Sequence, residues 1–104
     1  MTARELDARL AEAAPAAPTL LDVREPWEHA TCLIEGSVRL PMGQVPNALD
    51  QLDRDTEIVV ICHHGVRSYY VASFLEQAGF SNVINLEGGI DAWARDVDPA
   101  MAKY

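Results

Sequence analysis

Four short runs of apolar residues, each bounded by polar residues, predict the strands of a sheet. They span residues 19–23, 37–40, 57–61 and 82–86. Runs of this length that are rich in Val, Ile and Leu are typical of strands buried on both faces. Segments with apolar residues at helical spacing separate them. Strands that alternate with helices in this way predict an α/β domain, in which helices cover both faces of a parallel sheet.

Helices are predicted before, between and after these strands. Thr2 and Glu5 have the spacing of a capping box. Pro26 is well placed to begin a second helix, and Gly79 lies where the helix that begins at Val66 should end. The expected apolar helix faces are Leu6, Leu10 and Ala13; Val45, Leu49 and Leu52; Val71, Phe74, Leu75 and Ala78; and Ile90 with Trp93.

The other segments predict connectors and a tail. The Ala-Pro-Ala-Ala-Pro sequence of residues 14–18 should end the first helix, and Gly88 with Gly89 should open the last one. The tail from Asp96 is polar and is expected to pack loosely. Three large aromatic side chains are expected to fill the core between helices and sheet: Trp27, Phe74 and Trp93.

Composition narrows the possible functions. A chain of 104 residues is expected to form one domain over residues 1–104. Its net charge of −8, with only eight Lys and Arg, argues against nucleic-acid binding. No apolar run approaches the ~20 residues that span a bilayer, and the N-terminus lacks a signal-peptide pattern. We therefore expect no membrane contact, a cytoplasmic location, and free thiols at Cys32 and Cys62.

The strongest candidate for chemistry is Cys62. It directly follows the strand at 57–61, and four residues separate it from Arg67 at the start of a helix. Free backbone N–H groups and the positive end of the helix dipole favour anions at such a position. With Arg67 nearby, these features should favour the reactive thiolate.

Two further polar clusters should lie at the same edge of the sheet. Residues 22–24 and 87–89 also follow predicted strands, and ligands of open α/β sheets bind at the carboxyl ends of the strands. His63 and His64 could bind zinc together with Cys62. Adjacent loop residues rarely aim at one ion, however, and no fourth ligand is evident, so we expect no metal and no cofactor.

The order of these landmarks resembles a single-domain rhodanese. The resemblance rests on residues 20–25 (Leu-Leu-Asp-Val-Arg-Glu), on residues 34–37 before Leu40-Pro41, on residues 62–68 (Cys-His-His-Gly-Val-Arg-Ser), and on residues 86–90 with Trp93. It implies a rhodanese-like, doubly wound parallel sheet of about five strands. It also implies a sulfurtransferase that forms a cysteine persulfide.

Site residues follow from the resemblance by position. Cys62 would be the sulfur-carrying nucleophile, and Asp22 and Arg24 would support its loop. The substrate-binding loop would consist of His63, His64, Gly65, Val66, Arg67 and Ser68. Many members have arginine at the position of His63, so one permanent positive charge fewer is expected beside an anionic donor. The resemblance gives Cys32 no role.

The resemblance implies transfer of sulfane sulfur from thiosulfate or a persulfide donor to a thiol or cyanide. Its partners would be small sulfur donors and acceptors, or a protein thiol. One alternative is a sulfur carrier or interaction module for a protein partner. A less favoured alternative is a cysteine phosphatase or arsenate reductase, whose anion loop has the form Cys-x5-Arg. Only four residues separate Cys62 from Arg67 here, which suits a sulfur atom better than a tetrahedral oxyanion.

Overall fold

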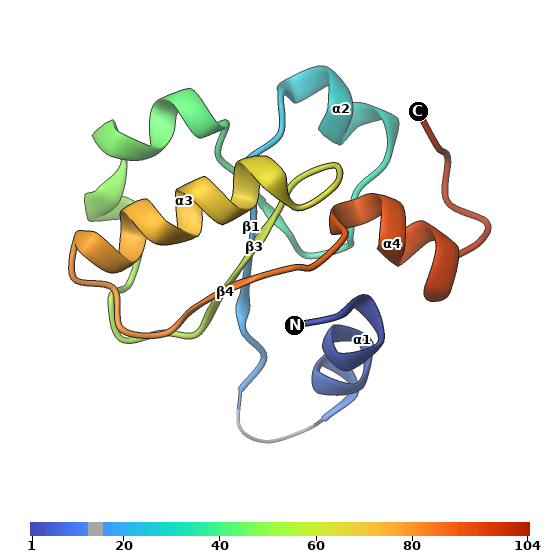
Figure 1. The fold of residues 1–104 in the computed structure, drawn as a ribbon, viewed down its shortest axis with the longest axis horizontal. Coiled ribbons are helices and arrows are strands. Elements are labelled where there is room, and N and C mark those ends of the chain that lie inside the picture. Colours follow the sequence, from blue (N-terminus) through green and yellow to red (C-terminus); the bar gives the residue numbers. More distant parts are fainter. Residues whose placement is uncertain (13–15) are drawn as a thin grey trace.

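The four strands predicted from the apolar runs form one parallel sheet in the computed structural model, which describes residues 1–12 and 16–104 (Figure 1). The strands are β1 (Thr19–Asp22), β2 (Val38–Arg39), β3 (Ile58–Ile61) and β4 (Val83–Asn85), in the order β2-β1-β3-β4. The α/β class is therefore confirmed. The fifth strand that the resemblance implies is not present among the described residues.

Helices cover both faces of the sheet, as predicted. The helices are α1 (Ala3–Ala11), α2 (Pro26–Thr31), α3 (Val66–Gln77) and α4 (Gly89–Asp96). Because successive strand residues point to opposite faces, the strands feed two separate cores. On the α3 face these core residues are Leu21, Ile58, Val60, Val71 and Leu75. On the face of α1 and α4 they are Leu6, Leu20, Val59, Ile61, Ile90 and Trp93.

The first helix begins with the predicted capping box. The Glu5 N–H donates to Thr2 Oγ1 at 3.1 Å, and the Thr2 N–H donates to Glu5 Oε1 at 2.9 Å. The predictions for Ala13 and for the start of the 14–18 connector fall on residues outside the described part of the chain. None of the helices in the described ranges is long and apolar enough to cross a membrane.

Three sequence predictions are wrong. The segment around Val45 forms two 3-10 helices, Met42–Asn47 and Leu49–Gln51, instead of one α-helix; Pro46 lies inside it and has no N–H to donate. Trp27 and Phe74 are 61% and 39% exposed, so of the three aromatic residues expected in the core only Trp93 lies there. The tail is not loose, because Tyr104 packs against α2 and the loop that follows β3.

Helix α4 binds directly to the residues that follow β3, here called the cysteine loop (residues 62–68). The Ile90 N–H donates to the Cys62 carbonyl at 2.8 Å, and the Asp91 N–H donates to the His63 carbonyl at 3.0 Å. Gly89 has a φ of +60°, and a Cβ there would lie 2.4 Å from the Cys62 carbonyl oxygen. The close approach of α4 to the cysteine loop therefore requires glycine at this position.

We predict that Gly89→Ala destabilises the fold by at least about 2 kcal/mol, because it combines a left-handed backbone with a backbone collision. Urea unfolding followed by circular dichroism measures this change. The matched control is Gly43→Ala, since a Cβ at Gly43 meets nothing within 4 Å; it should change stability by no more than about 0.5 kcal/mol. Equal stability of the two variants would contradict the close approach described above.

Candidate active site

The Cys62 sulfur lies at the carboxyl end of β3, on the core side of the cysteine loop. The residue is only 1% exposed. The Gly65 N–H donates to Cys62 Sγ at 3.0 Å, and Ser68 Oγ lies 3.2 Å from the same sulfur. The carbonyls of Cys62 and His63 accept hydrogen bonds from α4, and the Gly65 N–H faces the sulfur. This arrangement suits a negatively charged sulfur atom.

Asn85, at the end of β4, holds the cysteine loop from the neighbouring strand. Its side-chain amide donates to the Gly65 carbonyl at 3.2 Å, and its side-chain oxygen accepts a hydrogen bond from the Ser68 hydroxyl. Asn85 therefore positions both groups that contact Cys62 Sγ. The sequence indicates no role for Asn85, because it is one polar residue inside the predicted strand at 82–86.

Arg67 forms an ion pair with a buried carboxylate on α2. Its two terminal nitrogens donate to Glu28 Oε1 at 2.6 Å and to Oε2 at 2.8 Å. The Glu25 N–H and the Tyr104 hydroxyl donate to the same carboxylate at 3.0 and 2.7 Å. The hydrogen bonds from Arg67 lower the pKa of Glu28 to about 2, against the opposing effect of its burial. Glu28 in turn raises the pKa of Arg67.

Asp22 and Arg24 form a second, fully buried pair beneath the first. Arg24 donates to both carboxylate oxygens of Asp22, at 3.0 and 2.7 Å. It also donates to the carbonyls of Glu28 and Cys32 at 3.2 and 2.7 Å. Arg24 thus holds the middle and the C-terminal end of α2, and through Glu28 it acts on Arg67. Within the described residues, no contact joins this pair directly to the Cys62 sulfur.

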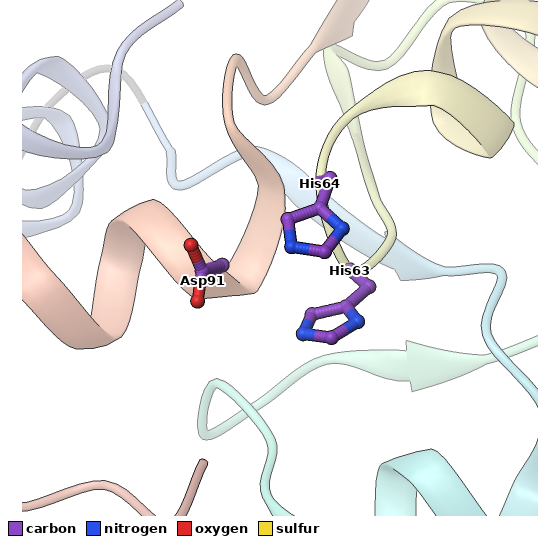
Figure 2. Close-up of side chains that lie close together, drawn as sticks. All are labelled: His63, His64 and Asp91. Atoms are coloured by element: carbon purple, nitrogen blue, oxygen red, sulfur yellow. The ribbon is translucent and has the colours of Figure 1, made fainter. Parts of the chain in front are cut away.

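His63 and His64 turn their rings towards Asp91 on α4 (Figure 2). The His63 ring stacks between His64 and Tyr104, with centroid distances of 4.0 Å on each side. Its burial, together with the neighbouring His64, lowers the pKa of His63. His63 is therefore largely uncharged at neutral pH and is a poor substitute for an arginine charge.

Tyr104 closes this side of the site. Its hydroxyl accepts a hydrogen bond from Arg24 at 3.0 Å and donates to Glu28, and its ring packs edge-on against Trp27. Burial raises its pKa to about 12, so the hydroxyl keeps its proton at neutral pH. Figure 1 shows how the chain after α4 returns towards α2 to place this residue.

The three clusters predicted at the carboxyl edge of the sheet do come together, in part through residues that the sequence did not identify. The cysteine loop accepts hydrogen bonds from the first turn of α4 and from Asn85, whereas residues 22–24 reach it through Glu28. Glu28 could have been suspected, since it is the acidic residue at N3 of a helix that begins with proline. The position of Tyr104 could not be inferred from the sequence, because a polar tail does not indicate which part of the fold it packs against.

We predict that Glu28→Gln lowers stability by about 2 kcal/mol at pH 7, because it removes a charge that receives several hydrogen bonds. In the wild type, Glu28 is ionised in the folded state down to a pKa of about 2, while an ordinary glutamate takes up a proton near 4.5. The contribution of Glu28 is therefore complete above pH 4.5 and is lost as the pH falls to about 2.

The measurement is the free energy of urea unfolding at several pH values from 7 to 2.5. Glu28→Gln should flatten the loss of stability on acidification. Glu35→Gln removes an exposed carboxylate and is the matched control, which should follow the wild type. A Glu28→Gln profile parallel to that of the wild type would show that the ion pair does not set this dependence.

Comparison with known proteins agrees with this geometry. The model of the rhodanese-like domain family matches residues 2–96. A sulfurtransferase of Allochromatium vinosum is 40% identical over 83 residues, 80% of this chain and 78% of that protein. The thiosulfate sulfurtransferase GlpE of Actinobacillus pleuropneumoniae is 34% identical, over 83% of this chain and 80% of that protein.

Two further comparisons extend this result. A putative sulfur carrier protein of Bacillus subtilis, YrkF, is 39% identical over 71% of this chain and 40% of that protein. The crystal structure of SSP1007 from Staphylococcus saprophyticus has a TM-score of 0.84 at 33% identity, covering 93% of this chain and 94% of that one. These names support sulfur-transfer chemistry in general, and the family match over nearly the whole length decides the classification: the chain belongs to the rhodanese-like domain family.

Proposed function

We propose that this chain is a rhodanese-type sulfurtransferase that carries sulfane sulfur as a persulfide on Cys62. The observation that carries the proposal is the position of the Cys62 sulfur, which lies 3.0 Å from the Gly65 N–H at the start of α3. A sulfur anion at this point gains a backbone donor and the positive end of the helix dipole. Relatives named as sulfurtransferases support the same chemistry.

The proposed reaction needs no group beyond the residues described. The Cys62 thiolate attacks the outer sulfur of thiosulfate, a new S–S bond forms, and the bond to the inner sulfur breaks, so that sulfite leaves with its electron pair. The outer sulfur remains on Cys62 as an anionic persulfide. Cyanide then takes this sulfur as thiocyanate, or an acceptor thiolate takes it as a persulfide, and the Cys62 thiolate is restored.

Ser68 and Asn85 allow the Cys62 sulfur to be hydrogen-bonded both as a neutral thiol and as a thiolate. The Ser68 hydroxyl has one proton, which it donates to Asn85, so towards Cys62 its oxygen is available to accept the S–H proton of a neutral thiol. Once the thiol is deprotonated, rotation of the hydroxyl turns its proton towards the sulfur. The thiolate then receives hydrogen bonds from Gly65 and Ser68, in the manner of an oxyanion hole.

We favour thiosulfate as the donor, because the relative GlpE is named as a thiosulfate sulfurtransferase. Thiosulfate is also an anion, and the loop around Cys62 suits an anion. The uncharged His63 ring predicts weak binding of that anion. A protein persulfide as donor, and a protein thiol as acceptor, is the second candidate; the sulfur carrier among the relatives supports it. The single domain over residues 1–104 and the cytoplasmic location stay predictions.

We predict that thiosulfate adds one sulfur atom to the wild type and that Cys62→Ser abolishes both this adduct and thiocyanate formation. Intact-protein mass spectrometry measures the adduct, and a thiocyanate assay measures the transfer. The matched control is Cys32→Ser, which removes the second thiol of the chain and should retain both signals. Activity that persists in Cys62→Ser and disappears in Cys32→Ser would assign the sulfur to Cys32 instead.

A further prediction distinguishes sulfur transfer from phosphate-ester chemistry. The short loop between Cys62 and Arg67 should not accommodate a tetrahedral phosphate, and Arg67 is already engaged by Glu28. We expect no hydrolysis of an aryl phosphate above the rate of Cys62→Ser. Turnover by the wild type that Cys62→Ser lacks would favour a cysteine phosphatase and contradict the proposal.

A further inference from the structure

Three metal-binding side chains face one another beside the cysteine loop. His63 and His64 come from the loop and Asp91 from the first turn of α4, and Figure 2 shows the two rings turned towards the carboxylate. One potential ligand atom of each residue lies within 4.8 Å of the other two. From the sequence no metal is expected, because adjacent loop residues rarely aim at one ion and because no further ligand is evident beside Cys62, His63 and His64. The fold supplies one from 27 positions further along the chain.

The backbone holds these three residues in place. The Asp91 N–H donates to the His63 carbonyl at 3.0 Å, and the adjacent Ile90 N–H donates to the Cys62 carbonyl at 2.8 Å. Helix α4 can therefore not move away from the loop without breaking two hydrogen bonds. The His63 ring is also fixed by stacking on Tyr104. The site thus has a rigid base from which the side chains project.

The ligand atoms are available. Within the described part of the chain, the Asp91 carboxylate and the two imidazoles make no hydrogen bond and no ion pair, although all three lie close together. Two imidazoles and one carboxylate form a ligand set that suits Zn²⁺ and its first-row neighbours, not Mg²⁺ or Ca²⁺.

We propose that His63, His64 and Asp91 bind one divalent transition-metal cation, with Zn²⁺ as the best fit. Ligands of a tetrahedral zinc ion lie about 3.3 Å apart, so the side chains must approach by rotation from their present spacing. His64 is exposed and Asp91 half-buried, which leaves both free to do so. Three protein ligands leave a fourth position for water or another small ligand.

Such a cation would join the cysteine loop to α4 through side chains as well as through the backbone. The inference does not depend on the proposed sulfur transfer, because the ligands, their spacing and their free lone pairs are independent of what Cys62 carries. Its test therefore measures binding and not activity.

The test is isothermal titration of the full chain with Zn²⁺ at pH 7.5, for the wild type and for His64→Ala and Asp91→Ala. We expect one Zn²⁺ per chain with a Kd on the order of 1 μM, weaker than four-ligand structural zinc sites. Because loss of even an outer-shell partner typically weakens metal binding at least about tenfold, each variant should lose at least that factor. Circular dichroism checks that both variants remain folded.

Two controls separate this site from other zinc ligands of the chain. His29→Ala removes the remaining histidine, whose ring lies 4.0 Å from Asp22, and should bind Zn²⁺ as the wild type does. Cys62→Ser should also keep the binding. Unchanged affinity in His64→Ala and Asp91→Ala would overturn the proposal. Loss of binding in Cys62→Ser alone would overturn it as well, since the thiol would then be the ligand.

Discussion

The hydrogen bonds between the first turn of α4 and the carbonyls of Cys62 and His63 are the constraint on which the rest of the site depends. They fix the peptide groups that follow Cys62 and His63. The next part of the cysteine loop is held from β4, where Asn85 donates to the Gly65 carbonyl, and the Gly65 N–H donates to the sulfur. The site is therefore held by hydrogen bonds from two elements that lie far along the chain.

A second layer of interactions determines where Arg67 lies. Glu28 receives hydrogen bonds from Arg67, from Tyr104 and from the start of its own helix, while Arg24 donates to carbonyls in the middle and at the C-terminal end of that helix. Much of the Arg67 charge is thereby balanced, and the orientation of its guanidinium group is fixed. The net positive field around Arg67 is therefore weaker than the sequence alone would suggest.

The strands, the helix at Val66 and the place of Cys62 could be predicted because they follow from local patterns. Apolar runs, glycine positions and the carboxyl-edge rule all act over a few residues. Asn85 and Tyr104 could not be predicted from such patterns, since each acts by contact with residues distant in sequence. The N3 position of Glu28 in α2 likewise gives no indication of its ion pair with Arg67. Trp27 was misplaced for the opposite reason: a large aromatic residue suggests a core position, yet α2 packs through Glu28, and its tryptophan lies outside.

The two tryptophans of the chain lie in contrasting surroundings. Trp93 is packed into the core between α4 and the sheet, whereas Trp27 lies at the surface with its ring edge-on to Tyr104. Their fluorescence therefore comes from two different regions: emission from Trp93 follows the global unfolding of the chain, and emission from Trp27 follows the position of the Tyr104 ring at the rim of the site. The intrinsic tryptophan fluorescence thus contains separable information on the folding of the chain and on the position of its C-terminal tail.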